Sequence, residues 1–462
     1  MKTLSDTIVA IATPLGEGGL SVLRVSGPRS IAICDSCFAG RSLLSVASTH
    51  TAHYGYFVDT SGKKIDEVVE TIFRSPHSYT TEDVVEISCH GGAWLARLIL
   101  EILTEAGARL ARPGEFTQRA FINGRIDLTQ AEAVADLIRS RSQWEQRQSL
   151  EQLGGSLSII VRDLKARILH TCGLVELGLD FAEEGVEIVD KTVLIGELDA
   201  LMLKIKVMTH SFSQTKLYRE GVRTVIVGRP NVGKSSLLNV LIGRNRAIVT
   251  EIAGTTRDSI SEELEIEGVR FQLTDTAGLR ESHDIVESEG IRRTNHELSI
   301  ADIILFIYDS SLGLHRDELA VLDALRSAPE AGTRKVIVVA NKADLIAERT
   351  LENDVTGRSL LVSAITGFGI VHLKQALFEQ VVELCNPQQE NSVPITNLRH
   401  ARALQSASEY LERAMTTLRR DISGESAAVD LMAANKSLGI IVGEITSDDI
   451  LNDVFSNFCI GK

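Results

Sequence analysis

The feature that most constrains this chain is the segment from Gly228 to Ser235, which reads GRPNVGKS. It fits the phosphate-binding loop pattern G-x-x-x-x-G-K-[ST]. The strand-like run 224–227 precedes it and the helix-like run 236–241 follows it. In such a loop the glycines let backbone N–H groups face phosphates at a helix N-terminus. We expect Lys234 to reach the outer phosphates and Ser235 to bind Mg²⁺. For this segment alone, an unrelated glycine turn is the alternative.

Three more motifs of a GTPase follow, each after a strand-like run. Residues 275–278 read DTAG, where a carboxylate can hold Mg²⁺ through water and a glycine N–H can meet the γ-phosphate. Residues 341–344 read NKAD. There Asp344 can accept two hydrogen bonds from guanine, a pair of donors that adenine lacks. Residues 363–364, Ser-Ala, would close the base pocket with a backbone N–H. The pairing with Asp344 predicts that the nucleotide is GTP. With all four motifs in order, this portion resembles a translation-factor-type small GTPase.

Length and charge bound the rest of the chain. At about 150 residues per domain, the 462 residues predict roughly three domains. A net charge of −14 disfavours nucleic-acid binding by bulk attraction, so an RNA contact needs a local patch. The apolar runs are too short for a signal peptide or a membrane span. We therefore expect a cytoplasmic protein whose six cysteines are thiols.

The N-terminal third alternates short strand-like runs with turns, which predicts an α+β domain. The strand 84–89 places Val85, Ile87 and Cys89 on one face and Glu86 on the other. A carboxylate flanked by apolar residues is costly to bury without a partner. The alternative is that this face of the strand is solvated.

Four residues, Cys34, Cys37, His50 and His53, have part of the spacing of a zinc finger. The two histidines are too close together, because fingers place three to five residues between them. We prefer the interpretation that Cys34 is a core residue of a helix.

Helical patterns lie on both sides of the GTPase. One helix is expected over 128–149, with a break at 154–155 where two glycines stand, and a second over 157–168. After the GTPase, a seven-residue repeat predicts a packed bundle helix with core positions Leu404, Leu411 and Leu418. A last short helix is expected around 450–455. We infer that these helices form one domain into which the GTPase is inserted.

The chain ends with the residues FCIGK, so that Cys459 stands fourth from the end. Prenylation boxes have a cysteine there, but Gly461 and Lys462 fit the last two positions poorly and no polybasic run precedes them. We reject a lipid anchor. Two interpretations of Cys459 stay open, a reactive free thiol and a small buried residue.

Further motifs, all but one of them outside the GTPase, extend the resemblance to almost the whole chain. They are DTIVA at 6–10, LRVSG at 23–27, SYT at 78–80 with ED at 82–83, HGG at 90–92, RPGEF at 112–116, GTTRD at 254–258 and FCIGK at 458–462. With them, the sequence resembles the MnmE (TrmE) family of tRNA uridine-modification GTPases.

That resemblance implies a multidomain α/β protein. Its expected parts are a tetrahydrofolate-binding and dimerising α+β domain at 1–121, a helical-bundle domain in two pieces at 122–215 and 385–462, and an inserted Ras-like P-loop GTPase domain with a mainly parallel sheet at 216–384.

The resemblance also implies the chemistry. Such proteins act as homodimers with a FAD-dependent partner, MnmG. Together they add an aminomethyl or carboxymethylaminomethyl group to carbon 5 of the wobble uridine of certain tRNAs. A 5-formyl- or methylene-tetrahydrofolate supplies the one-carbon unit, and the implied folate residues are Arg24, Glu86, Arg125 and Lys462. Glu86 suits the paired donors of a pterin edge, and arginines suit a glutamate tail. The family can have lysine where Arg125 stands, and the two residues are not equivalent in geometry.

The GTPase details fit the same family. Leu279 stands where Ras-like enzymes carry a water-orienting glutamine, so another group must orient water and neutralise charge. In the resembled family a K⁺ ion takes the arginine-finger role, and its implied ligands are Asn231, Thr250, Ile252 and Thr255. Thr256 would join Ser235 on Mg²⁺, and Glu287 would orient the attacking water. By pattern alone, Glu287 is one acid of a charged surface segment.

The complete set of expected GTP contacts comes from five segments. These residues are Asn231, Val232, Gly233, Lys234, Ser235, Ser236, Thr250, Glu251, Ile252, Ala253, Gly254, Thr255, Thr256, Asp275, Thr276, Ala277, Gly278, Asn341, Lys342, Asp344, Ser363 and Ala364.

The resemblance places Lys462 near the folate, and a thiol near a lysine is more readily ionised. Cys459 would then act as a nucleophile or proton donor.

A second class of function is a GTP-switched ribosome-assembly or RNA-binding factor without covalent chemistry. A stand-alone folate-dependent methyltransferase leaves the GTPase unexplained.

Overall fold

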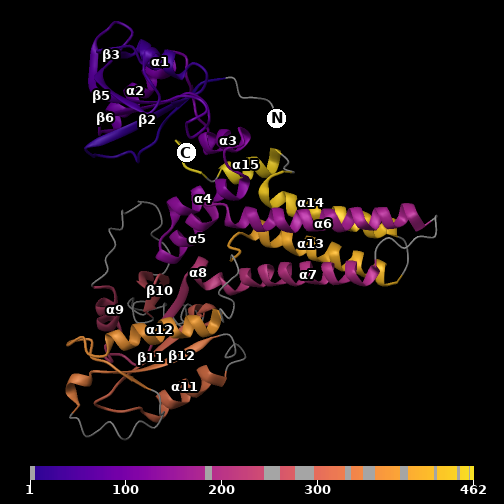
Figure 1. The fold of residues 1–462 in the computed structure, drawn as a ribbon. Coiled ribbons are helices and arrows are strands. Elements are labelled where there is room, and N and C mark those ends of the chain that lie inside the picture. Colours follow the sequence, from indigo (N-terminus) through magenta and orange to yellow (C-terminus); the bar gives the residue numbers. More distant parts are fainter. Residues whose placement is uncertain are drawn as a thin grey trace. The chain divides into compact units, whose positions relative to one another are not determined.

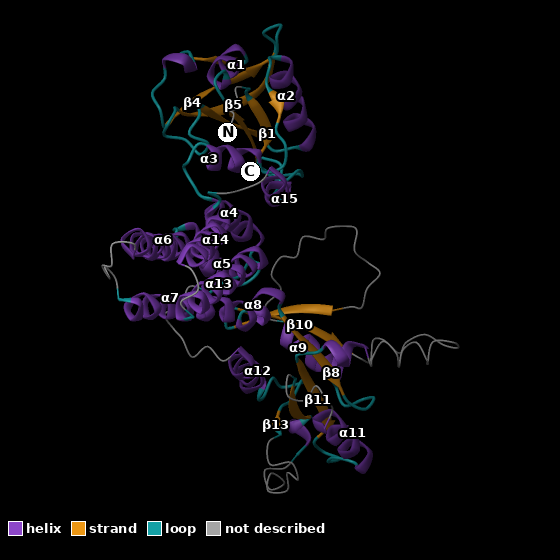
Figure 2. Cartoon of the chain, turned by 90° about the vertical axis from the view of Figure 1, so that its right-hand side faces the viewer, coloured by secondary structure: helices purple, strands orange, loops and turns teal. Residues whose placement is uncertain are grey.

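The chain forms two compact units that are each discontinuous in sequence. The computed structural model describes residues 6–182, 190–243, 261–275, 296–327, 334–346, 359–385, 394–420, 424–444, 448–456 and 458–461. The first unit comprises residues 1–138, 149–201 and 406–462, and the second comprises 139–148 and 202–405. Figure 1 labels many of the elements of both units, and Figure 2 colours helices and strands differently.

The first unit begins with a mixed seven-stranded sheet in the order β3-β4-β5-β6-β2-β1-β7. Its strands are β1 (Ile8–Ile11), β2 (Leu20–Ser26), β3 (Phe38–Gly40), β4 (Thr51–Val58), β5 (Lys64–Phe73), β6 (Val84–His90) and β7 (Arg109–Leu110). Only β1 and β7 pair in parallel among the pairs described. The expected α+β domain is therefore confirmed.

Two helices cover one face of this sheet. They are α1 (Ser30–Ser36) and α2 (Ala93–Glu105), and a short 3₁₀ helix, η1 (Leu44–Val46), lies beside α1. The buried side of β6 consists of Val85, Ile87 and Cys89, as the period of two predicts. Cys34 of α1 is fully buried in the same core, which confirms its expected packing role.

Helices make up the remainder of the first unit. They are α3 (Glu115–Ile122), α4 (Leu128–Arg139), α5 (Gln143–Leu153), α6 (Ser156–Ala182), α7 (Lys191–Gln214), α13 (Leu398–Arg419), α14 (Gly424–Val442) and α15 (Asp448–Ser456), of which α4, α5, α7 and α13 also include residues of the second unit. α6 packs along α14, and Arg419 of α13 pairs with Asp199 of α7 at 3.0 Å.

The expected single helix over 128–149 is wrong. The chain forms α4 and α5 instead, with a break at Ser140–Ser142. Ser142 Oγ accepts a hydrogen bond from the backbone N–H of Glu145 at 3.2 Å. This is the hydrogen bond by which a serine caps the N-terminus of a helix, here α5. The capped conformation competes with the helical one that would extend α4. The break after α5 at Gly154 and Gly155 is confirmed.

The second unit is built on a six-stranded sheet in the order β13-β12-β11-β8-β10-β9, parallel except for β9. Its strands are β8 (Val222–Val227), β9 (Ser261–Ile266), β10 (Val269–Asp275), β11 (Ile303–Asp309), β12 (Lys335–Asn341) and β13 (Leu360–Leu361). Its other elements are α8 (Lys216–Glu220), α9 (Lys234–Ile242), α11 (Arg316–Ser327), α12 (Ile370–Cys385) and the 3₁₀ helix η3 (Ala343–Leu345).

Every residue of the central strand β11 is buried, because helices cover both faces of the sheet. Ile303, Leu305 and Ile307 share a core with α9 and α12. Phe306 and Tyr308 pack with α11 on the other side. This is the expected P-loop GTPase fold with a mainly parallel sheet.

The turn between β9 and β10 contacts the start of α5, within the second unit. The N–H of Gln143 donates to Glu265 at 3.2 Å, and the N–H of Trp144 donates to the carbonyl oxygen of Gly268 at 3.4 Å. The Trp144 ring stacks on Tyr218, with 4.9 Å between ring centroids. Residues far apart in sequence thus fix one end of the β9–β10 hairpin.

None of the described helices combines the length and the apolar character that crossing a membrane would require.

Glu70 of β5 is a buried carboxyl in the core between the sheet and α1. It has no exposed surface, and neither of its oxygens has a hydrogen-bond partner. Burial, and then the charge of Asp35, raise its pKa well above the ordinary 4.5. The folded chain therefore keeps a proton that the unfolded chain loses.

This difference predicts how stability depends on pH. The contribution of Glu70 to the free energy of unfolding is greatest below pH 4.5. It falls as pH rises towards the raised pKa. The slope should be about 1.4 kcal/mol per pH unit within that window. Glu70→Met should abolish the slope and stabilise the sheet at pH 8. Amide hydrogen exchange of residues 64–73, measured at several pH values and corrected for intrinsic rates, gives this dependence of stability on pH. An unchanged slope in Glu70→Met, or a loss of slope in the exposed Glu67→Gln control, would contradict the assignment.

Candidate functional site

The phosphate-binding loop joins β8 to α9 with the geometry that its glycines require. A side chain on Gly228 would come within 2.2 Å of the Ile307 carbonyl oxygen, and one on Gly233 within 2.3 Å of Asn341 Nδ2. Gly233 and Asn231 have left-handed backbones, with φ of 96° and 67°. Lys234 Nζ donates to the carbonyl oxygens of Gly228 and Arg229 at 2.9 and 2.8 Å, so its amine lies across the loop.

The first turn of α9 meets the end of β10, as the parallel pairing of β8 and β10 dictates. Ser235 Oγ donates to Asp275 Oδ2 at 2.7 Å. A hydroxyl and a carboxylate side by side offer hard oxygen ligands, the kind that Mg²⁺ prefers. The donor set fits the predicted Mg²⁺ position. Val232, in the loop, is buried, whereas Ser236, in the first turn of α9, is exposed.

Asn341, at the end of β12, ties the loops of the site together. Its Nδ2 donates to the Val232 carbonyl oxygen at 2.8 Å, and its Oδ1 accepts the N–H of Ala364 at 3.1 Å. The side chain is almost fully buried. Asn341 therefore links the phosphate loop to the segment after β13. Of the two residues expected to close the base pocket with a backbone N–H, Ala364 donates its N–H to Asn341.

Lys342 follows with a left-handed backbone, φ of 68°, and its Nζ pairs with Asp309 Oδ2 at 2.7 Å. Burial opposes ionisation of Asp309, but the hydrogen bonds from Lys342 and Ser311 and the charge of Lys342 together outweigh it and lower the pKa of that carboxyl. The ion pair holds the Lys342 side chain over the carboxyl ends of β11 and β12.

Asp344 lies in η3 and is exposed, so its carboxylate is accessible to a base. Its Oδ1 accepts a hydrogen bond from Ser363 Oγ, and Ser363 is fully buried. The buried hydroxyl orients the carboxylate without neutralising it. The carboxyl ends of β12 and β13 thus bring together the five predicted base-recognition residues, Asn341, Lys342, Asp344, Ser363 and Ala364.

Several predicted residues lie outside the described part of the chain. They are Thr250, Glu251, Ile252, Ala253, Gly254, Thr255, Thr256, Thr276, Ala277, Gly278, Glu287 and Lys462.

The first unit holds a second cluster of predicted residues. Arg24 of β2 and Glu86 of β6 are directly paired in the sheet register. Arg24 Nη2 lies 2.7 Å and its Nε 2.9 Å from Glu86 Oε1. Their side chains are 15% and 30% exposed, so the pair is accessible to a ligand. The carboxylate on the outer face of β6 therefore has an arginine as its partner.

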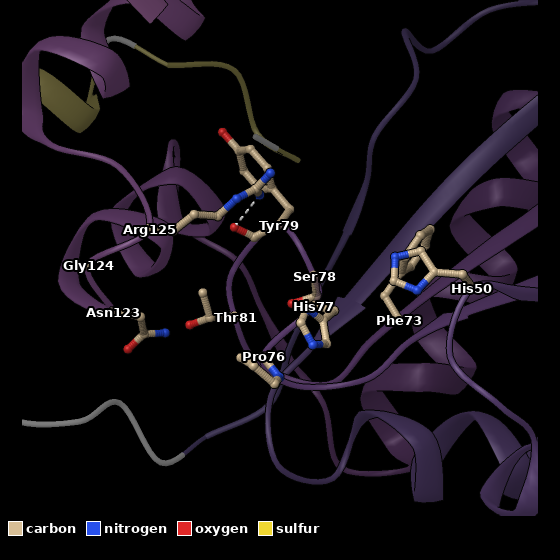
Figure 3. A pocket seen from close by; sticks show the side chains of 10 residues that line it. All are labelled: His50, Phe73, Pro76, His77, Ser78, Tyr79, Thr81, Asn123, Gly124 and Arg125. Carbon is tan, nitrogen blue, oxygen red and sulfur yellow. Dashed lines mark hydrogen bonds between the residues drawn. The ribbon is translucent and has the colours of Figure 1, made fainter. Parts of the chain in front are cut away.

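Tyr79 is the centre of this cluster. The guanidinium of Arg24 lies 5.6 Å and that of Arg125 4.9 Å from the Tyr79 ring centroid. Arg125 Nη1 also donates to the Tyr79 carbonyl oxygen at 2.7 Å (Figure 3). Tyr79 OH bonds to Thr117 at 2.9 Å, and burial is the main cause of the raised pKa of the phenol. Arg24 and Arg125 are thereby gathered around one ring, and Glu86 is joined to them through Arg24.

The C-terminal segment reaches the same place. Arg24 Nη1 donates to the carbonyl oxygen of Gly461 at 3.3 Å. Gly461 has φ of 97°, and a side chain there would come within 2.5 Å of the Ile11 carbonyl oxygen. Phe458 is buried, but Cys459 is exposed. Of the two interpretations of Cys459, the small buried residue is therefore wrong.

Three contributors to these sites were missed in the sequence. Tyr79 lies in the SYT motif at 78–80, which predicts no role for its ring, and Asp309 lies outside the motifs. Asp309 ends a strand parallel to β12, so strand order could have placed it beside Lys342. Arg119, 1% exposed, bonds to Asp6, Glu82 and Glu115 at 2.8–3.2 Å and fixes the segment that carries Tyr79. No motif rule indicated that network.

The sheet, the phosphate loop and the base-recognition residues define a P-loop GTPase. Two family models match the chain: one described as "MnmE helical domain" over residues 128–459, and one described as "GTP-binding protein TrmE N-terminus" over 7–125. The chain belongs to the MnmE family.

Curated relatives match this chain over almost its full length. The "tRNA modification GTPase MnmE" of Salinibacter ruber is 43% identical over 461 residues, 99% of each chain. The protein of the same name from Aquifex aeolicus is 41% identical over 461 residues, 99% of this chain and 100% of its own. Among solved structures, Aquifex aeolicus Era is 25% identical, covering 40% of this chain and 65% of its own, with a TM-score of 0.28.

The base pocket makes a testable prediction. Asp344→Asn should lower GTP affinity at least tenfold and favour xanthosine triphosphate, because each charge-assisted bond to guanine contributes about 1.5–3 kcal/mol. Titration with fluorescent GTP and XTP measures both. The matched control is Asp323→Asn, an exposed aspartate of α11. Unchanged GTP affinity in Asp344→Asn would refute the assignment.

Proposed function

We propose that this GTPase drives modification of the wobble uridine of certain tRNAs, by adding an aminomethyl or carboxymethylaminomethyl group at carbon 5. The observation that carries the proposal is the junction in the first unit. There the C-terminal Gly461 bonds to Arg24, beside Glu86, with the exposed Cys459 two residues away. A GTPase that acts only as a switch has no need of this cluster. The relatives named above are tRNA modification GTPases, which supports the same activity here.

We infer that a reduced folate binds at this junction through Arg24, Glu86, Arg125 and Lys462. The folate supplies the one-carbon unit when it is bound. The accessible Arg24–Glu86 pair offers an acceptor for the donors of a pterin edge. Tyr79 offers an aromatic face, already flanked by two guanidinium groups, to a planar ring.

The GTPase part of the proposal concerns ions and assembly. Ser235 and Thr256 hold Mg²⁺, and K⁺ is held by Asn231, Thr250, Ile252 and Thr255. Glu287 orients the attacking water. The chain acts in the cytoplasm as a homodimer with a FAD-containing MnmG-type partner. The domain division proposed is 1–121, 122–215 with 385–462, and 216–384.

Folate binding should depend on the Arg24–Glu86 pair. Glu86→Ala should abolish or strongly weaken binding of 5-formyltetrahydrofolate, because the acceptor is lost and Arg24 loses its orientation. GTP affinity should not change, because the nucleotide residues belong to the other unit. Calorimetry with both ligands decides, with the exposed Glu101→Ala of α2 as control. If Glu86→Ala binds folate normally, Glu86 is only the ion-pair partner of Arg24.

The function itself is tested by nucleoside analysis of tRNA from cells that lack this protein. Wobble-uridine modification should be lost and restored by the wild-type gene. Cys459→Ser should keep the fold and GTP hydrolysis but fail to restore modification, because serine is nearly isosteric and far less nucleophilic. Normal modification in the deletion strain would overturn the function. Restoration by Cys459→Ser would overturn only the role of the thiol.

A further inference from the structure

The carboxyl ends of β11, β12 and β13 separate two opposite charges that are close together in the sequence. Lys342 and Asp344 follow β12 with one residue between them, and β12 lies between β11 and β13 in the sheet. Lys342 Nζ pairs with Asp309 Oδ2, at the end of β11, at 2.7 Å. Asp344 Oδ1 instead accepts a hydrogen bond from the hydroxyl of Ser363, which follows β13. The ammonium is therefore drawn towards one neighbouring strand and the carboxylate towards the other.

The Asp309 carboxylate is held in place by its own segment. Its Oδ1 accepts the N–H of Ser311 at 3.0 Å and the Ser311 hydroxyl at 2.6 Å, so that Oδ2 faces Lys342. The side chain of Asp309 is 10% exposed and that of Lys342 is 29% exposed. Ser310 donates its N–H and its hydroxyl to the carbonyl oxygen of Asn341, at 2.9 and 2.6 Å. The segment 309–311 thus binds both residues at the start of the NKAD motif.

The backbone of Lys342 has a conformation that a lysine rarely adopts. Its φ is 68°, in the left-handed region, and its carbonyl oxygen accepts the N–H of Leu345 at 3.0 Å as η3 begins. A residue with a Cβ stays in this region where its surroundings impose the conformation. Backbone strain of this kind concentrates at functional sites, which directs attention to what holds Lys342.

Without Asp309, the Lys342 ammonium would have another carboxylate within reach. Lysine carries a point charge on a flexible four-carbon stem, so it can turn towards a carboxylate two positions further along the chain. Asp344 is that carboxylate, and it is exposed. Ionised carboxylates only accept hydrogen bonds, and each lone pair serves one donor. An ion pair between Lys342 and Asp344 would therefore compete with the N–H donors of guanine.

We propose that Asp309 is a positioning residue for guanine recognition, because it keeps the Lys342 ammonium away from the carboxylate of Asp344. Asp309 acts through Lys342 and does not contact the base. The proposal rests on the assignment of Asp344 to guanine made above, and it extends the specificity site to a third strand. Asp309 thereby contributes to the preference for GTP over a nucleotide whose base lacks the amino group of guanine.

The test measures the affinity of the full-length protein for GTP and for inosine triphosphate (ITP), whose base lacks that amino group. Asp309→Asn should lower GTP affinity about fivefold, the factor that corresponds to an exposed ion pair between Lys342 and Asp344. The ratio of GTP affinity to ITP affinity should also fall, because a carboxylate paired with lysine gains less from the second donor. The matched control is Asp302→Asn, which alters the acceptor of the Arg223 N–H beside the opposite end of β11. It should leave the ratio unchanged.

A second measurement separates positioning from a purely structural role. Lys342→Met keeps most of the apolar stem and removes the ammonium. In that background Asp309→Asn should leave the GTP-to-ITP ratio unchanged, since no ammonium is left to reach Asp344. An equal fall of the ratio in both backgrounds would overturn the proposal, and so would an unchanged ratio in Asp309→Asn alone.

Ser311→Ala gives the same test where Asp309→Asn does not fold. It removes an exposed hydroxyl that holds Asp309 and keeps the carboxylate. The ratio should fall in the wild-type background and not with Lys342→Met, and an unchanged ratio in the wild-type background would overturn the proposal. Unchanged GTP affinity in Asp344→Asn would overturn the assignment on which the proposal rests. A normal loss in Asp344→Asn with an unchanged ratio in Asp309→Asn would overturn the role of Asp309 alone.

Discussion

The first unit depends on a buried carboxylate, Glu115. It is fully buried, and its oxygens accept hydrogen bonds from Arg109 and Arg119 and from the N–H of Arg112. Burial opposes its ionisation, but these donors outweigh burial and hold its pKa at about 2. Removing one partner from such a buried network typically costs about 3–5 kcal/mol, because a charge is left uncompensated.

The same network sets the position of the candidate site. Arg119 reaches both Asp6, just before β1, and Glu82, in the segment that carries Tyr79. Glu82 in turn accepts a hydrogen bond from Ser26, at the end of β2. The helix α3, two strands and the Tyr79 segment are therefore held by one set of charges. The ring around which Arg24 and Arg125 gather is fixed by residues that no ligand needs to touch.

Sequence reasoning was most accurate where chemistry is local. The phosphate loop and the NKAD segment could be read because their residues act within a few positions of each other. The Arg24–Glu86 pair could not be read in this way, because the two residues are 62 positions apart and their pairing depends on the register between β2 and β6. The break between α4 and α5 contains no glycine or proline, so the apolar period continued through it. The role of Asn341 as a link between loops needed the parallel order of the strands.

Strand β10 is anchored at both of its ends. Asp275, beside Ser235, ends the strand, and the turn at Gly268 that precedes it contacts Trp144. A seven-residue strand spans roughly 20 Å and resists compression along its axis. A displacement of the carboxylate along the strand axis would therefore move the Gly268 carbonyl oxygen that accepts the backbone N–H of Trp144. The strand thus joins the nucleotide site to the start of α5 by a direct mechanical path.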